Sequence, residues 1–514
     1  MNEWPAVRRV SYWLLPLFTG GLALLLYATT AAPWLTWAHD GADGGDLIAA
    51  TMTLGVPHPP GYPTYCLLAR LFAVLPLGNI ARRFNLFSAT AAAGAVAVVC
   101  LVVQRTFSDS SDEGDGAVRK GSWIESFIAA SIALSCATGH TLWSQATITE
   151  VYALSVLFFA SCLYLALRTS CSDKPLHWGM LGLLFGLGLG AHLTLVLMLP
   201  GLALLLWPHR NRARMVTLLF GTIVGIGVFA YLPLAARGAP PINWGDADSW
   251  GRFWWMVSGR MYQSYAFSLP LTSLPSRLAA WASLWRQNYG IVGLALALYG
   301  LSTWLAAAPR QAWATLITVA AYSLYAIGYD TTDSYVYLLP TYLITALWML
   351  EGARVAWTAL SDLPHSNAWR VLATIILLAM PVHSLYTHYD ALDLSRDRVA
   401  IEWAQTVVER LPPDAVLITG EDRHTFTMSY VQWVEHRRPD LWVVDGELWA
   451  HDWYREQPRP FLCAMAGEIP IDLFSLVDAA LLCGRPVYLG SERKDLTRRY
   501  ESSLDGVLWR IRAQ

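Results

Sequence analysis

The sequence predicts an α-helical polytopic membrane protein that carries a small α/β domain in its C-terminal part. Of its 514 residues, 55% are hydrophobic and only 14% are charged, and the mean hydropathy is +0.37. That apolar fraction is well above the usual fraction of a soluble domain. Apolar runs of about 18 or more residues recur, and runs of this length are typical of transmembrane helices. After about residue 388 the charges and prolines return, so we divide the chain into a membrane region, 1–387, and a C-terminal domain, 388–514.

The apolar runs predict about eleven transmembrane helices. The first run lacks a small-residue cleavage site and is too long for a simple signal peptide. The two runs that meet near His192 are the shortest. The predicted spans are 11–32, 86–106, 122–139, 150–168, 178–192, 193–207, 215–235, 290–308, 311–328, 335–357 and 368–387.

The lysines and arginines between these runs predict the orientation, because cytoplasmic loops are enriched in both. Four basic groups fall on one side if the N-terminus is cytoplasmic: Arg8 and Arg9; Arg105, Arg119 and Lys120; Arg168 and Lys174; Arg210, Arg212 and Arg214. Arg82 and Arg83 are the exception. The loops at 33–85 and 236–289 and the domain at 388–514 are then extracytoplasmic. The net charge of −2 favours no class of partner.

Two soluble segments follow from composition and periodicity. Residues 107–121 are acidic and rich in glycine and serine, which is typical of a solvated linker. In the C-terminal part, apolar spacing predicts helices at 399–411 and about 425–437, and short strands at 415–419, 441–444 and 486–489. This alternation predicts a small α/β domain. Cys463 and Cys483 could form a disulfide there, whereas the other five cysteines lie in or near apolar runs.

The most informative segment is the loop after the first span, which holds three carboxylates. A carboxylate at a membrane boundary is costly to desolvate, so such residues are candidates for function. Asp46 begins an apolar helical pattern and could equally be a helix cap. Asp43 lies in a glycine-flanked turn with no such structural role, and a carboxylate there suits a general base acting on a hydroxyl. We interpret Asp40 as a solvated loop acid.

The same loop continues with His58-Pro-Pro-Gly-Tyr-Pro63, a turn that prolines make rigid. A histidine fixed beside carboxylates could bind an anion, although a lone histidine is more often a structural hydrogen-bonding residue. Residues 64–77 are apolar but are interrupted by Arg70 and Pro76, which favours a helix at the membrane interface.

The second outer loop places arginines among aromatic residues. Such residues either anchor a protein at the interface or bind a phosphate through charge-assisted hydrogen bonds. Anchoring suits Arg252 beside Trp254 and Trp255. Arg237, directly after a span, and Arg260 are better placed for a phosphate.

Two further polar positions face the same side. His192 lies in the turn between two short spans and could be either a core histidine or a ligand. Asp330 and Asp333 lie in another outer turn, and we interpret them as ordinary loop acids.

Several motifs together resemble the protein O-mannosyltransferase-like membrane family of the GT-C glycosyltransferase superfamily. The family's acidic pair is often Asp followed by Glu, whereas the second acid here is Asp46, so Asp43 carries the stronger prediction. The turn at Gly420-Glu-Asp-Arg-His424 also departs from the family's pattern. The matching motifs are Asp43-Gly-Gly-Asp46-Leu-Ile, His58-Pro-Pro-Gly-Tyr-Pro63, Gly78-Asn-Ile-Ala, Phe84-Asn-Leu-Phe-Ser88, Thr149-Glu-Val-Tyr152, Asn243-Trp-Gly-Asp246, Tyr337-Leu-Leu-Pro340 and Arg438-Pro-Asp440.

The resemblance implies a GT-C-like fold and an inverting transfer of a sugar, mannose or another hexose, from a polyprenyl-phosphate donor to a hydroxyl of an extracytoplasmic protein or glycan. Asp43 and Asp46 are the expected catalytic residues. A phosphate leaving group needs only cationic stabilisation, for which the candidates are Arg237, Arg260, His58 and His192. The expected substrate-binding residues are Tyr62, Glu150, Tyr152, Asn243, Trp244, Asp246 and Tyr262.

No cofactor is expected and the scheme requires no metal, although a divalent cation bound by Asp43 and Asp46 remains open. Two other classes of protein are alternatives: a transporter or flippase for lipid-linked anions, and an inactive membrane receptor. A transporter should place its polar residues near the bilayer midplane. Here the acids and arginines are predicted in outer loops, which favours surface chemistry.

Overall fold

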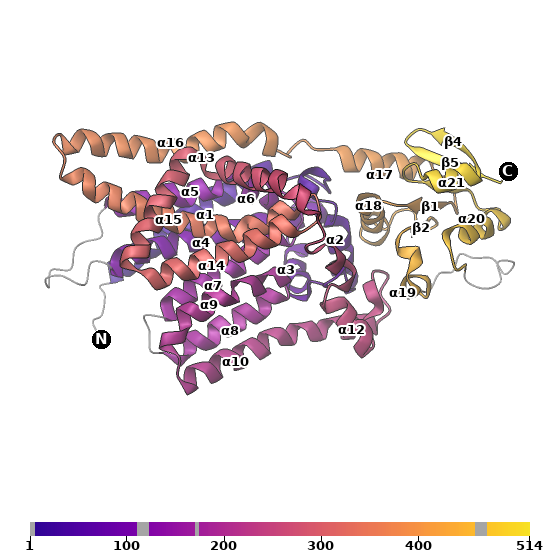
Figure 1. Ribbon diagram of the computed structural model, residues 1–514. Helices are drawn as coiled ribbons and strands as arrows, with labels where there is room; N and C mark the ends of the chain where they lie inside the picture. The colour runs from indigo at the N-terminus through magenta and orange to yellow at the C-terminus, as the bar shows by residue number, and fades with distance from the viewer. Residues whose placement is uncertain (1–5, 110–122, 170–173, 458–469, 514) are drawn as a thin grey trace.

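The computed structural model describes residues 6–109, 123–169, 174–457 and 470–513, and consists of a helix bundle with a small sheet domain at one end (Figure 1). The chain starts near the far end of the bundle and reaches the sheet domain last. The helices α2, α3 and α12 lie at the end of the bundle that faces the sheet domain (Figure 1). The two loops that carry the predicted site therefore lie at the same end as the C-terminal domain.

The bundle is built from sixteen α-helices in the described residues. They are α1 (Ala6–Thr30), α2 (Gly44–Thr53), α3 (Pro63–Ala73), α4 (Ile80–Asp109), α5 (Trp123–Ala137), α6 (His140–Ala146), α7 (Tyr152–Thr169), α8 (Pro175–Leu189), α9 (Leu199–Leu206), α10 (Arg212–Ile226), α11 (Tyr231–Ala236), α12 (Trp250–Val257), α13 (Leu274–Ala307), α14 (Pro309–Gly328), α15 (Leu339–Ser361) and α16 (Ser366–Leu392).

Seven helical segments of the described chain are long and apolar enough to cross a membrane, and the protein is an integral membrane protein. Three other predicted spans lie on shorter apolar helices, α5, α8 and the segment Leu193–His209. The remaining one, 311–328, lies on α14. Each of the eleven predicted runs is thus helical, but the number eleven is not established as a count of membrane crossings.

Small residues let neighbouring helices approach closely in the bundle. A methyl group on Gly182 of α8 would come within 2.1 Å of the Leu218 carbonyl oxygen of α10, and one on Gly221 of α10 within 2.1 Å of the Gly179 carbonyl oxygen. Helices in lipid associate through such close packing because lipid leaves no hydrophobic driving force between them.

The predicted loop at 236–289 is largely helical instead. It contains α12 and the first half of α13, and α13 bends at Gly290, where φ is +63°. The predicted span that begins at residue 290 therefore starts at this bend. Arg277 and Arg286 interrupt the apolar residues of the helical half before the bend, which explains why the sequence did not predict a separate span there.

The two arginines that break the charge rule have structural roles. Arg82 donates to the carbonyls of Ala28, Ala31 and Ala32 at the end of α1. Arg83 donates to the carbonyls of Ala73 and Gly78 after α3. Cations favour helix C-termini, where carbonyls lack partners, so both charges are held by the fold.

The C-terminal domain contains a five-stranded sheet, so the predicted small α/β unit is confirmed. Strands β1, β2 and β3 are parallel, with Val416 opposite Trp442 and Val487, and β5 and β4 extend the sheet antiparallel, in the order β2-β1-β3-β5-β4. The predicted helices and strands occur with shifted ends, and β4, β5, α19, α20 and α21 were not predicted. The elements are α17 (Val399–Arg410), β1 (Val416–Thr419), α18 (Asp422–Trp433), β2 (Trp442–Asp445), α19 (Asp452–Arg455), α20 (Leu473–Leu482), β3 (Val487–Leu489), α21 (Lys494–Arg499), β4 (Glu501–Asp505) and β5 (Leu508–Arg512).

The sheet domain docks on the outer loops through α18. Trp34 donates to Glu435 Oε1 at 2.8 Å, and Trp37 donates to Thr427 Oγ1 at 3.1 Å. Gly45 of α2 lies against the backbone of α18, where a methyl group would come within 2.1 Å of the carbonyl oxygen of Phe426. The close approach of α2 and α18 therefore depends on glycine at position 45.

Two predicted features fall partly outside the described residues. The linker at 107–121 lies mostly there. Cys483 is disulfide-bonded, but Cys463 lies outside the described residues, so the proposed Cys463–Cys483 pair stays a prediction.

The substitution Gly45→Ala should destabilise the protein by about 1–3 kcal/mol, because the added methyl group has only backbone atoms of α18 to displace. Thermal unfolding of the purified protein in detergent measures the effect. Gly251→Ala in α12 is the matched control, because a methyl group there meets no atom within 4 Å. Equal melting temperatures for the two variants would contradict the close approach.

Candidate functional site

The first outer loop places His58 between two carboxylates. His58 Nδ1 lies 2.8 Å from Asp46 Oδ2, and its Nε2 lies 3.3 Å from Asp43 Oδ2. The His58 and Asp46 side chains are 6% and 2% exposed, whereas Asp43 is 31% exposed. Asp43 is therefore the member of this row that a substrate can reach.

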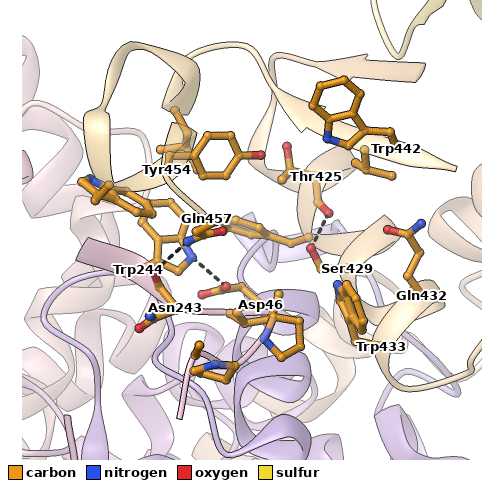
Figure 2. A pocket seen from close by; sticks show the side chains of 18 of the residues that line it. Asp46, Asn243, Trp244, Thr425, Ser429, Gln432, Trp433, Trp442, Tyr454 and Gln457 are labelled. Atoms are coloured by element: carbon orange, nitrogen blue, oxygen red, sulfur yellow. Dashed lines mark hydrogen bonds between the residues drawn. The ribbon is translucent and has the colours of Figure 1, made fainter. Parts of the chain in front are cut away.

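The helix α2 positions both carboxylates. Asp43 directly precedes α2 and makes no side-chain capping bond, and Asp46 lies in the first turn. The predicted alternative, in which Asp46 caps the helix, is wrong for this reason. Its Oδ2 accepts instead from the backbone N–H of His58 at 2.9 Å, and its Oδ1 accepts from Trp244 Nε1 at 3.0 Å (Figure 2).

Trp244 reaches Asp46 because the two outer loops pair with each other. Val56 N–H donates to Ile242 O at 2.8 Å, and Trp244 N–H donates to Val56 O at 3.1 Å. Gly55 permits this pairing, since a methyl group there would come within 2.1 Å of the Ile242 carbonyl oxygen. The sequence predicted Trp244 as a substrate contact, but its indole N–H is used by Asp46.

The row carries an imidazolium at neutral pH. Burial opposes protonation of His58, but the charges and hydrogen bonds of Asp43 and Asp46 outweigh it and raise the pKa of His58 well above its usual value. Both ring nitrogens face carboxylates, so the structure gives His58 a different role from the expected phosphate ligand: it orients Asp43.

A second group of acids lies beside Asp43. Glu150 is 2% exposed, and neither carboxylate oxygen has a hydrogen-bond partner. Desolvation, followed by repulsion from Asp43, raises the pKa of Glu150 well above its usual value. Asp333 accepts from the Tyr152 hydroxyl at 3.2 Å, and burial and Asp43 raise its pKa as well. Asp333 is therefore not the ordinary loop acid that the sequence suggested.

The C-terminal domain adds two residues that sequence reasoning missed. Phe426 stacks on His58 with ring centroids 6.1 Å apart. Although Asp422 keeps contact with solvent, desolvation by the surrounding protein, followed by repulsion from Asp43 and Asp445, raises its pKa to about 7. In the sequence, the acidic turn at 420–424 was the signal for Asp422, but it carried no prediction because it departs from the family's pattern.

Aromatic side chains form a wall beside these acids. The His192 ring lies 6.1 Å from Tyr62, 5.4 Å from Tyr152 and 5.8 Å from Tyr337, measured between centroids. Burial and then the positive charge of His58 lower the pKa of His192 to about 4, so it is neutral at pH 7. Its expected role as a cationic phosphate ligand therefore lacks the charge that the role requires. Tyr262 also lies near Asp43, whose charge, after desolvation, raises the Tyr262 pKa.

The arginines of the second loop differ in their partners. Arg252 pairs with Asp246 at 2.6 Å and with Glu456 at 2.7 Å, so it joins the loop to the C-terminal domain, and its role as a membrane anchor stays a prediction. Asp246 also accepts from Asn243 Nδ2 at 2.9 Å, which makes both residues part of the loop's own structure and not evident substrate ligands. Arg237 and Arg260 are exposed, and their guanidinium groups make no hydrogen bond or ion pair among the described residues.

No cluster of three or more histidine, cysteine or acidic side chains that could hold a metal ion occurs in the part of the chain that the structure describes. A cation shared by Asp43 and Asp46 would have to displace the His58 ring that lies between them. The expectation that the reaction needs no metal stays a prediction.

Two family models match the chain. Residues 43–215 match the protein O-mannosyl-transferase TMEM260 N-terminal domain, and residues 400–472 match the TMEM260-associated domain 2. The protein O-mannosyl-transferase TMEM260 of Mus musculus is 24% identical over 90% of this chain and 67% of its own length. The protein O-mannosyl-transferase tmem260 of Dictyostelium discoideum is 20% identical over 91% of this chain and 62% of its own length. The chain thus spans about two thirds of these relatives.

Solved structures share the fold. ArnT from Cupriavidus metallidurans in the apo state matches with a TM-score of 0.61 at 12% identity, over 96% of this chain and 97% of that one. The same protein bound to undecaprenyl phosphate matches with a TM-score of 0.57 at 11% identity. The predicted GT-C-like fold and the predicted resemblance to O-mannosyltransferase-like proteins are confirmed.

The state of His58 predicts a pH dependence of stability. Its pKa is raised in the folded protein, so its stabilising contribution is complete below about pH 6.5, the unfolded value, and is lost as pH rises through the folded value. The wild-type melting temperature should therefore fall as the pH rises above about 6.5. His58→Gln should show a smaller fall, because glutamine keeps a donor but does not titrate. The control His436→Gln, at an exposed position, should keep the wild-type slope; a wild-type slope in His58→Gln would contradict the charged row.

Proposed function

Proceeding from this similarity to the O-mannosyltransferase-like membrane proteins of the GT-C superfamily, we propose that the protein is an inverting glycosyltransferase. It moves a hexose, most simply mannose, from a polyprenyl-phosphate donor to a hydroxyl of an extracytoplasmic acceptor, which makes protein O-glycosylation its function. The observation that carries this proposal is the row of Asp43, His58 and Asp46, in which only Asp43 is open while His58 and Asp46 are buried and hydrogen-bonded to each other.

In the proposed reaction, Asp43 is the general base. Its oxygen takes the proton of the acceptor hydroxyl as that oxygen forms a bond to the anomeric carbon. The bond between this carbon and the phosphate oxygen breaks, its electron pair leaves with the polyprenyl phosphate, and the configuration inverts. Asp46 and Trp244 fix the His58 ring, and His58 in turn fixes the Asp43 carboxylate, so the base is held in place before the substrate arrives.

The donor sugar fits beside Glu150 in this scheme. A buried carboxyl with two unpartnered oxygens and a raised pKa can hydrogen-bond sugar hydroxyls without bringing another full charge to the site. Tyr62 and Tyr152 lie next to it and offer aromatic faces, and Tyr262 closes the side towards Asp43. We therefore propose these residues as the sugar-binding part of the site.

The phosphate of the donor is assigned to Arg237 and Arg260. Both guanidinium groups are exposed. Arg260 lies two residues before Tyr262, which is close enough to Asp43 for the charge of Asp43 to raise the Tyr262 pKa. ArnT has been solved with undecaprenyl phosphate, a polyprenyl phosphate, which supports the same class of lipid here. In this arrangement the N-terminus is cytoplasmic and the C-terminal domain is extracytoplasmic, in the inner or plasma membrane.

Asp43→Asn should lower transfer from polyprenyl-phosphate mannose at least about 100-fold, because the amide cannot accept the acceptor's proton. Transfer is measured with the protein reconstituted in lipid, and donor binding is measured separately and should be retained. Asp40→Asn is the matched control in the same loop, because Asp40 is exposed and its partners are Thr332, at 3.5 Å, and Tyr335, outside the row of Asp43, His58 and Asp46. Near-normal transfer by Asp43→Asn would remove this residue as the base.

Arg237→Ala should weaken donor binding by about tenfold or more through loss of a charge-assisted hydrogen bond. The measurement is binding of polyprenyl-phosphate mannose to the protein in nanodiscs. Arg212→Ala is the matched control, since Arg212 is also exposed and begins the same helical segment, Arg212–Ala236, at its other end. Equal donor affinity for both variants would exclude Arg237 from the phosphate site.

A further inference from the structure

A cavity of about 460 Å³ lies on the other side of Asp46 from His58, and the proposed reaction does not use it. Its walls come from residues 239–244 of the second outer loop and from α18, β2 and α19 of the C-terminal domain (Figure 2). Its volume is in the range of small-ligand and peptide pockets. The cavity exists only because the C-terminal domain docks on the loop.

The walls of the cavity are aromatic and uncharged. Trp244, Phe426, Trp433 and Trp453 line it together with prolines, and Trp433 is 44% exposed. Among the described residues, Asp46 is the only charged lining residue, and both of its oxygens are already bonded. No arginine or lysine of the described ranges lines the cavity, so these walls offer a phosphate-bearing lipid headgroup no counter-charge, and an uncharged occupant fits them best.

One wall is the free edge of a sheet. Strand β2 is at the end of the sheet order and bonds to β1 on one side only. Trp442 N–H donates to Ala415 O in β1, so the alternation of a strand directs the N–H and C=O of Val443 to the opposite, free edge. On either side of Val443 this edge is already capped, because Leu441 O accepts from Gln432 and Asp445 N–H donates to the Tyr454 hydroxyl.

Two buried polar atoms of the lining residues lack partners. Asn243 Oδ1 is an acceptor and Trp453 Nε1 is a donor, and neither has a hydrogen bond. Both atoms have almost no accessible surface, so the polar groups that this wall offers to a ligand are the N–H and C=O of Val443, a donor and an acceptor. A peptide backbone supplies both along its length.

We propose that this cavity binds an extended, uncharged peptide segment of the acceptor protein, which pairs with the free edge of β2 at Val443 and places apolar side chains among the tryptophans. Addition of a strand to a sheet edge is an established mode of peptide recognition, with backbone bonds giving affinity and side-chain pockets giving specificity. This inference rests on the proposed function, because it names the acceptor of that reaction. Asp46 borders the cavity at the end of the row opposite Asp43, so the segment that carries the acceptor hydroxyl extends beyond the cavity to reach the base.

The test measures binding without transfer. A fluorescent pool of uncharged peptides of about ten residues, each with a central threonine and flanking apolar residues, is titrated against the full chain in nanodiscs without donor. Ser429→Trp fills the cavity from α18 and should weaken binding at least about tenfold. Ser429→Ala removes only the bond from its hydroxyl to Thr425 O and should bind as the wild type does.

Ser503→Trp is the matched control, because Ser503 is an exposed residue of β4, the strand at the opposite edge of the sheet. It should leave peptide binding unchanged.

Peptides with alternate amides N-methylated should bind at least about fivefold more weakly if the backbone pairs with β2. Three results would overturn the proposal. The peptides do not bind, Ser429→Trp binds them as well as the wild type does, or mannotetraose displaces them as effectively as unlabelled peptide does. If the peptides bind as expected but the wild-type protein transfers no sugar, the proposed function is contradicted, whereas the peptide-binding site is supported.

Discussion

The arrangement of the outer end depends on the need of one buried carboxylate for hydrogen-bond donors. Asp46 is 2% exposed, and an ionised carboxylate at that depth is tolerated only when it is well partnered. It obtains its donors from the backbone and ring of His58 and from the indole of Trp244. These bonds join the first loop to the second, and the stack of Phe426 on His58 joins both to the C-terminal domain. The partners of Asp46 thus come from both loops, and the residues that hold it also orient Asp43 and line the aromatic cavity.

The electrostatics of the site are unusual in having many acids and one cation. Glu150, Asp333 and Asp422 all have raised pKa values, because each is desolvated and each lies near Asp43. The pKa of His58 is raised for the opposite reason, since two carboxylates hold its charge. A raised pKa favours the protonated form of these acids, which can donate hydrogen bonds to sugar hydroxyls, while Asp43 is the acid that a substrate can reach. This division between proton-holding and open acids is common where acid–base chemistry occurs.

The sequence predicted the secondary structure and the location of most segments, but it predicted few of the contacts between segments. Apolar length located the helices, and the excess of acids singled out Asp43 and Asp46, because both signals are local. The bond from Trp244 to Asp46 joins residues 198 positions apart, and only the pairing of Val56 with the second loop brings them together. Asp333 and Asp422 looked like loop acids because their neighbours come from other segments. Arg82 and Arg83 appeared to oppose the orientation because the helix ends that they bind are not visible in composition. Strands β4 and β5 carry mixed polar residues at a sheet edge and have little apolar pattern to detect.

The contact of Gly45 with the Phe426 carbonyl has a consequence for the order in which the protein becomes competent. The first loop is made early, but the helix that packs on it is translated about 380 residues later, and chains generally fold from the N-terminus as they are synthesised. During that interval His58 lacks its stacking partner and the space beside Asp46 has no far wall. The outer end of the membrane bundle is therefore incomplete during synthesis, and it becomes complete only when α18 has been translated and packs against α2. Synthesis itself thus sets the moment at which this end of the molecule acquires its final shape.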